Sequence, residues 1–343
     1  MTAIATGHVL SREWRLVHYL NGQPNDTDVE LVTVEVDEPD PGFVRVENEV
    51  MSVEPYMRGR MSSRSTYADP YVLGEAMRAP AIGRVTASSS VEIPVGATVL
   101  HDFGWREHAL VPETACTVVH GQASVSALHL GLLGIPGMTA WVGVRRIAQL
   151  KSGDVVFVSS AAGAVGSTVV QIAKALGCTV IGSAGSKDKV ALVRELGADA
   201  AFDYHDGSVG TLLRGALAEL GAPGLDAYFD NVGGDHLEAA IRVLNDHARV
   251  ALCGMISIYS AESPQPGPSN LIKLVWRRAR MEGFLLRDHR DARPEFEADM
   301  REWLHVGAVR AVETAVPGGI EGAWAGFLGM LDGTGTGKTI VPL

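Results

Sequence analysis

The pattern of apolar and polar positions in this chain changes at about residue 128. Before that point, short runs rich in β-branched residues are separated by turn residues, which is typical of an antiparallel β domain. The candidate strands are residues 29–36, 43–53, 82–86, 98–103 and 108–111. We therefore expect a barrel-like β domain over residues 1–128.

From about residue 129, β-like runs alternate with helical patterns. Such alternation is typical of a parallel sheet with crossover helices, and so predicts an α/β fold with a Rossmann doubly wound sheet over residues 129–307. After residue 308 the β-runs return, and we expect this tail (308–343) to rejoin the N-terminal domain. The candidate strands are 155–160, 179–184, 200–202, 225–230, 248–253 and 281–286 in the α/β part, and 312–316 and 338–341 in the tail.

Length and charge narrow the class of protein. At 343 residues the chain is long for one core, which favours two domains. The formal net charge of −11 argues against a nucleic-acid partner, since phosphate binding needs clustered basic residues. One basic group exists, and its spacing indicates a single solvated helix face. Its members are Lys273, Arg277, Arg278 and Arg280.

The three cysteines, Cys116, Cys178 and Cys253, are far apart and include no C-x-x-C pair. They do not fit a structural zinc site, and a sparse, odd count is typical of a reducing cytoplasm. The N-terminus lacks the basic and apolar regions of a secretory signal. The least charged stretch, residues 126–144, is interrupted by glycines and a proline, so we expect a buried helix there and no membrane span.

The segment from Val155 to Gly166 predicts a dinucleotide site. An apolar run at 155–158 leads into a turn whose fingerprint positions are Ala161, Gly163 and Gly166, with alanine in place of the usual first glycine. A helical pattern follows, and Gly177 stands at its end. A helix N-terminus after such a turn presents backbone N–H groups to a pyrophosphate. The apolar helix positions are Val169, Ile172, Ala173 and Leu176.

The end of the second strand indicates which dinucleotide binds. NAD enzymes usually place an acidic residue there to hold the ribose 2′-hydroxyl. Here residues 182–186 are Gly-Ser-Ala-Gly-Ser, and Lys187 and Lys189 flank Asp188. A hydroxyl and an ammonium group favour a 2′-phosphate, so we expect NADP (NADPH) as the cofactor.

A second glycine-rich stretch, residues 333–339, looks like a nucleotide-triphosphate loop ending in Lys338. The motif requires glycine where this chain has Asp332, and the chain ends five residues after Lys338. We therefore expect no triphosphate site there.

Several segments, in order along nearly the whole chain, resemble the zinc-independent medium-chain dehydrogenase/reductases. The closest likeness is to the NADPH-dependent alkenal/one double-bond reductases, which include leukotriene B4 dehydrogenase/prostaglandin reductase and curcumin reductase types. The matching segments are residues 53–58 (VEPYMR), 104–107 (GWRE), 134–141 (GIPGMTAW), 161–166 (AAGAVG), 228–234 (YFDNVGG), 253–259 (CGMISIY), 281–284 (MEGF) and 337–341 (GKTIV).

This resemblance implies a GroES-like (chaperonin-10-like) catalytic β-barrel domain, formed by both chain ends, around a Rossmann NADP-binding domain. It also implies a homodimer with residues 281–286 near the interface. The early cysteine ligand and the Gly-His-Glu segment of zinc-dependent relatives are absent from the sequence, so no metal is expected.

The resemblance also implies roles for individual residues. Tyr259 is the expected catalytic phenol, and Tyr56 is expected to line the substrate pocket, with Arg58 ordering its loop. One departure is Gly335, which stands where relatives usually have a cofactor-contacting asparagine. The expected cofactor-binding residues are Met138, Thr139, Gly163, Ala164, Val165, Gly185, Ser186, Lys189, Tyr204, Asn231, Cys253, Phe284 and Leu286.

The function that follows is reduction of the C=C bond of an α,β-unsaturated aldehyde or ketone. A hydride goes to the β-carbon, while a phenol such as Tyr259 polarises the carbonyl and could donate a proton. Whether Tyr259 or solvent gives that proton stays open. The alternatives are an NADPH:quinone reductase, a non-catalytic NADPH-binding protein, and an enzyme that oxidises an allylic or secondary alcohol, which the missing zinc ligands disfavour.

Overall fold

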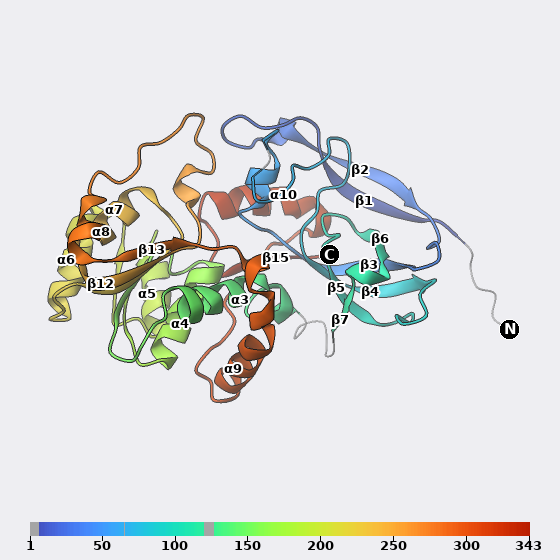
Figure 1. Ribbon diagram of the computed structural model, residues 1–343. Helices are drawn as coiled ribbons and strands as arrows, with labels where there is room; N and C mark the ends of the chain where they lie inside the picture. Colours follow the sequence, from blue (N-terminus) through green and yellow to red (C-terminus); the bar gives the residue numbers. More distant parts are fainter. Residues whose placement is uncertain (1–6, 65, 120–126) are drawn as a thin grey trace. The chain divides into compact units, whose positions relative to one another are not determined.

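A computed structural model describes residues 7–64, 66–119 and 127–343 (Figure 1). The chain divides into two compact units, one of residues 1–130 and 314–343 and the other of residues 131–313. The first unit contains two sheets and the second unit one, and each unit has its own apolar cores.

The first unit is built around an antiparallel sheet and a separate two-stranded ribbon of β1 and β2. Its elements are β1 (Val9–Leu16), η1 (Asp26–Asp28), β2 (Val29–Val36), β3 (Phe43–Ser52), α1 (Met57–Arg60), β4 (Ala81–Ser88), β5 (Thr98–His101), β6 (His108–Pro112), η2 (Glu113–Ala115), β7 (Thr117–Val118), η3 (Ala127–Leu130), β14 (Glu313–Ala315), α10 (Gly319–Leu331) and β15 (Lys338–Pro342). The expected strands of the β domain are present, and β1 and β7 are additional.

The long strand β3 organises this sheet. One of its edges pairs with β4, while the other pairs with β6 through its first half and with β15 through its second half. The register places Ile340 opposite Ser52 and Val341 opposite Met51. The C-terminal tail therefore completes the sheet begun by the N-terminal residues, as the sequence predicts.

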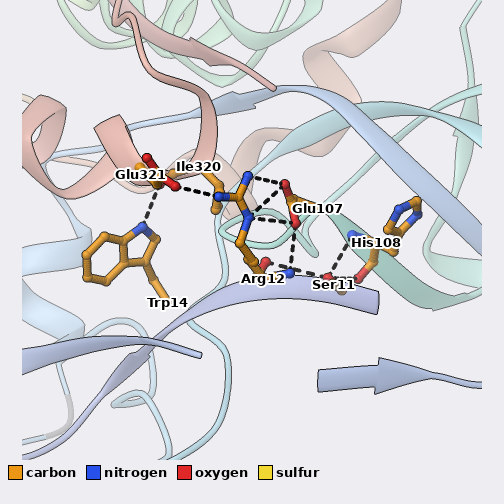
Figure 2. A network of polar contacts seen from close by, with 7 residues as sticks. All are labelled: Ser11, Arg12, Trp14, Glu107, His108, Ile320 and Glu321. Atoms are coloured by element: carbon orange, nitrogen blue, oxygen red, sulfur yellow. Dashed lines mark hydrogen bonds and ion pairs between the residues drawn. The ribbon is translucent and has the colours of Figure 1, made fainter. Parts of the chain in front are cut away.

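Polar contacts also join the two chain ends within this unit (Figure 2). The guanidinium of Arg12, on β1, donates to Glu107 Oε1 at 2.7 Å and to Glu321 Oε1 at 2.6 Å. The indole of Trp14 donates to the Ile320 carbonyl oxygen at 2.7 Å. One strand thus contacts both the loop before β6 and helix α10.

The second unit contains a six-stranded parallel sheet in the order β10-β9-β8-β11-β12-β13. This is the doubly wound sheet that the alternating pattern predicts. Its elements are α3 (Ile135–Val142), the π-helical turn η4 (Gly143–Ile147), β8 (Val155–Val158), α4 (Ala164–Ala175), β9 (Thr179–Ala184), α5 (Lys187–Glu195), β10 (Ala200–Asp203), α6 (Val209–Glu219), β11 (Leu225–Asp230), α7 (Gly234–Arg242), β12 (Leu244–Leu252), η5 (Ile256–Ile258), α8 (Ile272–Arg277), β13 (Arg280–Gly283), η6 (Leu286–Ala292) and α9 (Arg293–His305).

Both faces of this sheet are covered, because side chains alternate along each strand. Val156 and Val158 of β8 pack into the core shared with α3, α4 and α9. Phe157, between them, packs into the opposite core, shared with α6 and α7. Strands buried on both faces read as continuous apolar runs, which explains why the sequence pattern located them well.

The prediction that four basic residues lie on one helix face is wrong. Helix α8 ends at Arg277, Arg278 is a left-handed C-cap (φ 50°), and Arg280 lies on the edge strand β13. Only Lys273 and Arg277 share the helix. The guanidinium groups of Arg277 and Arg278 both form ion pairs with Asp246. These two arginines therefore lie together because they share a carboxylate, and not because they lie on one face of a helix.

Candidate active site

The loop after β8 is a tight turn of small residues. Ser160 has a left-handed backbone (φ 50°), and Gly163 is the N-cap of α4. A Cβ atom on Gly166 would lie 2.2 Å from the Ser160 carbonyl oxygen, so this position requires glycine. The N–H of Ala161 donates to the Ser183 carbonyl oxygen at 2.8 Å and ties the turn to β9.

The first turn of α4 suits an anion. Gly163 provides no capping side chain, and the first helical turn contains no acidic residue. Backbone N–H groups at a helix start have no carbonyl partner within the helix, and the helix dipole adds positive potential there. The backbone at Gly163, Ala164 and Val165 therefore fits a pyrophosphate.

A second polar corner lies at the end of β9. Ser186 is the N-cap of α5, and its Oγ accepts a hydrogen bond from the Lys189 N–H at 3.3 Å. The Tyr204 N–H donates to the Ala184 carbonyl oxygen at 3.1 Å, which places Tyr204 beside the same turn. A Cβ atom on Gly185 would lie 2.7 Å from Tyr204 Oη. These predicted cofactor-binding residues thus surround one short segment.

The charges of this corner also suit a phosphate. Burial lowers the pKa of Lys189, because it disfavours the ammonium form. A phosphate beside Lys189 would favour the charged form again. Of the nearest acids along the chain, Asp188 is exposed, and Asp203 Oδ1 accepts from the His205 N–H at 3.0 Å. The charge of Asp203 also acts on Tyr204, since together with burial it raises the pKa of that phenol.

A buried carboxylate at the end of β11 was not expected from the sequence. Asp230 is fully buried, and its Oδ1 accepts hydrogen bonds from Tyr228 Oη at 2.6 Å, the Val232 N–H at 2.9 Å and the Gly233 N–H at 2.8 Å. Ser159 Oγ lies 3.3 Å from the same oxygen. Burial raises the pKa of Asp230, and the N–H and O–H donors oppose that rise.

Asp230 also joins the loops at the carboxyl ends of three strands. Its carbonyl oxygen accepts from the N–H groups of Cys253 and Gly254, at 2.9 and 3.1 Å. Asn231 donates from Nδ2 to the Ser159 carbonyl oxygen at 2.8 Å. The loops after β8, β11 and β12 are therefore held together at the edge where ligands bind in doubly wound sheets.

Tyr259 lies at this same edge, directly after η5. A Cβ atom on Gly254 would be 3.0 Å from Tyr259 Oη, so the phenol lies against the backbone that follows Cys253. Burial, and secondarily the Cys253 thiol, raises the pKa of Tyr259, while a backbone hydrogen bond from Met255 opposes the rise. The phenol is therefore neutral at physiological pH and can donate a hydrogen bond.

The remaining predicted cofactor residues of this unit lie around one core. Met138 is buried and Thr139 half-buried on α3. Cys253, Phe284 and Leu286 pack against the core that contains Met138. Strand β13 ends at Gly283, so Phe284 and Leu286 follow the strand and do not extend it to residue 286.

The other predicted tyrosine, Tyr56, belongs to the first unit. Tyr56 is half-buried at the N-cap of α1, and its pKa is raised well above the usual value, chiefly by burial and then by the charge of Glu54. Arg58 is buried and donates to the Gly22 carbonyl oxygen, which orders the loop before β2. Gly335 also lies in this unit, and a Cβ there would be 3.3 Å from Thr339 Oγ1.

Two family profiles cover most of the sequence. The N-terminal domain of oxidoreductase matches residues 12–119, and zinc-binding dehydrogenase matches residues 164–305. Prostaglandin reductase 1 of Rattus norvegicus is 37% identical over 338 residues, which make up 97% of this chain and 99% of that protein. The chain belongs to the medium-chain dehydrogenase/reductase family.

Two further members of this family confirm the resemblance to its alkenal-reductase branch. The 2-alkenal reductase (NADP(+)-dependent) of Nicotiana tabacum is 36% identical over 339 residues, 97% of each chain. The crystal structure of CurA from Vibrio vulnificus in complex with NADPH is 35% identical, with a TM-score of 0.90 over 96% of this chain and 98% of that one. A quinone oxidoreductase of Pseudomonas syringae, at 21% identity and a TM-score of 0.74, shares the fold alone.

Two further properties hold for the part of the chain that the structure describes. Within residues 7–64, 66–119 and 127–343, no group of three or more His, Cys, Asp or Glu side chains is arranged to hold a metal ion. None of the helices in those ranges has the length and apolar character needed to cross a membrane.

Proposed function

We propose that this protein is an NADPH-dependent reductase of the C=C bond of α,β-unsaturated aldehydes or ketones. The observation that carries the proposal is the corner of Ser186, Lys189 and Tyr204 around Gly185, where an NAD enzyme would usually have an acid. The chain is also 36–37% identical, over 97% of its length, to a 2-alkenal reductase and a prostaglandin reductase.

The residues present fit the cofactor. The backbone at 163–165 would bind the pyrophosphate, and Ser186, Lys189 and Tyr204 the 2′-phosphate. When bound, NADPH supplies a hydride to the substrate β-carbon. The remaining contacts, to the nicotinamide half and along the cofactor, fall to Met138, Thr139, Asn231, Cys253, Phe284 and Leu286.

Tyr259 has the properties that the enolate oxygen requires. As hydride arrives at the β-carbon, negative charge develops on the carbonyl oxygen, and a hydrogen bond from Tyr259 Oη would stabilise it. A neutral, half-buried phenol keeps its proton at the pH of the cell. The α-carbon then takes a proton from Tyr259 or from solvent. Tyr56, whose phenol is also kept neutral, would line the substrate pocket.

The test measures the oxidation of NADPH through the loss of its absorbance. Four substrates are compared, a linear 2-alkenal, a cyclic enone, a bulky aryl enone and a quinone, and each assay is repeated with NADH. Enal or enone turnover with a strong preference for NADPH is the expected result. Turnover of the quinone alone would favour the quinone-reductase alternative. Tight NADPH binding without any turnover would favour a non-catalytic binding protein.

We also propose that the protein works in the cytoplasm as a homodimer and without a metal. Its three cysteines are free thiols, as in proteins of a reducing compartment. Among the described strands, β13 is an edge strand of its sheet, and α8, which directly precedes it, exposes the apolar side chains of Val275 (69%) and Trp276 (63%). An unpaired strand edge and exposed apolar side chains are features that a dimer interface could cover. Light scattering of the purified protein would measure the oligomeric state, and activity should survive dialysis against a chelator.

A further inference from the structure

A buried ion pair lies immediately before Tyr56 in the first unit. Lys338 Nζ is 2.6 Å from Glu54 Oε1, and the two residues are only 2% and 5% exposed. The same ammonium donates to the Val53 carbonyl oxygen at 2.9 Å. Lys338, the lysine of the glycine-rich stretch 333–339, is therefore buried and paired with a carboxylate.

The pair joins the start of β15 to the turn that carries Tyr56. Ser52 Oγ donates to Glu54 Oε1, and the Val53 N–H donates to the Thr339 carbonyl oxygen at 3.2 Å. The Glu54 carbonyl oxygen in turn accepts from the Met57 N–H at 3.2 Å, which closes the turn around Tyr56. Residues 52–54 are thus held in place by both side-chain and backbone hydrogen bonds.

Fixing residues 52–54 has a consequence for the phenol two residues later. Tyr56 is half-buried, and the charged groups that act on it are Glu54, Asp102 and Arg60, with Tyr71 a further titratable neighbour. Of these, Glu54 belongs to the same turn and is itself held by Lys338. A shift of the Glu54 turn would therefore move Tyr56 directly.

We propose that Lys338 and Glu54 are positioning residues for Tyr56, and that through it they set how tightly an unsaturated carbonyl substrate is held. This inference rests on the proposed function, because it assigns Tyr56 to the substrate pocket. A direct measurement of the position of Tyr56 tests this inference separately from the proposed function.

The informative variant is the double substitution Glu54→Gln with Lys338→Met. Removing one partner alone would leave an uncompensated buried charge and could unfold the protein, whereas the neutral pair keeps the volume. The amide oxygen introduced by Glu54→Gln would still accept from the Ser52 hydroxyl. The control is Arg12→Met with Glu107→Gln, which removes the ion pairs of Arg12 with Glu107 and with Glu321 in the same unit (Figure 2).

Two readouts decide the proposal. With 3-fluorotyrosine incorporated, the fluorine NMR line of Tyr56, assigned by its loss in Tyr56→Phe, should shift or broaden in the Glu54/Lys338 variant and stay in place in the control. The KM for an enone should rise roughly tenfold, which corresponds to about 1.4 kcal/mol of binding free energy. The kcat and the Kd of NADPH should remain within about twofold.

The same double substitution made in a Tyr56→Ala protein should leave KM without a further rise, because the pair acts through Tyr56. An unmoved Tyr56 line, an unchanged KM, or a full additional rise in the Tyr56→Ala protein would overturn the proposal. If the wild-type protein reduces no enone, the proposed function fails, and the fluorine line still decides whether the pair positions Tyr56.

Discussion

Tyr204 Oη lies where a side chain on Gly185 would have to go, since a Cβ atom there would be 2.7 Å from that oxygen. Gly185→Ala should therefore displace the phenol from the predicted 2′-phosphate corner. We expect the Kd of NADPH to rise about tenfold or more, as for the loss of roughly one hydrogen bond to a charged group, and that of NADH to change little. Isothermal titration of both cofactors measures this.

A matched control is Gly215→Ala on α6, where a Cβ atom would meet nothing within 4 Å. It should leave both dissociation constants unchanged. If Gly185→Ala weakened NADH as much as NADPH, Tyr204 would have no specific role toward the phosphate.

Ser186→Asp separates helix capping from phosphate binding. Aspartate caps a helix as well as serine does, so α5 should keep its stability. Its negative charge would repel a 2′-phosphate and accept from a ribose 2′-hydroxyl. We expect the ratio of kcat/KM for NADPH to that for NADH to fall at least tenfold while Tm changes little.

Ser186→Ala is the complementary variant. It should cost about 1 kcal/mol of stability through the lost cap, with a smaller change in cofactor preference. Equal preference for NADPH in the aspartate variant and in the wild type would place the 2′-phosphate elsewhere.

Tyr259→Phe tests the predicted catalytic phenol. It removes the hydrogen bond to the developing enolate oxygen and leaves the ring in place, so kcat should fall about tenfold or more while the Kd of NADPH is kept. Because burial raises the pKa of Tyr259 above its usual value of 10.0, the wild-type kcat should show no loss from phenol ionisation below about pH 10. A kcat in Tyr259→Phe equal to the wild-type value would limit Tyr259 to packing.

His101 should make the fold sensitive to acid. Burial, aided by the charges of Arg106 and Arg78, lowers the pKa of His101 from 6.5 to about 3. Below pH 6.5 the unfolded chain binds a proton that the folded protein does not, so stability falls as the pH falls from 6.5 to 3. The slope from this group is at most about 1.4 kcal/mol per pH unit.

The comparison for His101 is His101→Asn, whose amide oxygen can replace Nδ1 as acceptor for the Phe103 N–H. Urea unfolding at pH 7 and pH 4.5 should show a smaller acid loss for the asparagine variant. An equal loss in both proteins would mean that His101 titrates normally.

The sequence predicted most of this fold because its main signals are local. The buried strands β8 and β9 read as continuous apolar runs, and the positive-φ Gly177 marks the end of α4 as predicted. Strand β1 was missed, since its sequence, VLSREWRL, mixes charged and apolar residues. One partner, β2, is the next strand along the chain, but the hydrogen bonds to Glu107 come from a distant part of the chain.

The site was predicted less completely for the same reason. Ser186 and Lys189 stand together in the sequence, and the fingerprint that precedes them is a known signal. The buried network of Asp230, Tyr228 and Ser159 has no such signal, because an acid at a strand end reads as a solvated residue. Only the parallel pairing of β8 with β11 brings Ser159 to Asp230.

The state of the cysteines has a consequence for an enzyme that handles electrophiles. Unsaturated aldehydes and ketones add to thiolates, and the thiolate form is the reactive one. Burial raises the pKa of Cys116 and Cys178 to about 11 and that of Cys253, beside Tyr259, to about 12. At neutral pH nearly all of each thiol is protonated, so these three cysteines should react slowly with the compounds that the protein is proposed to reduce.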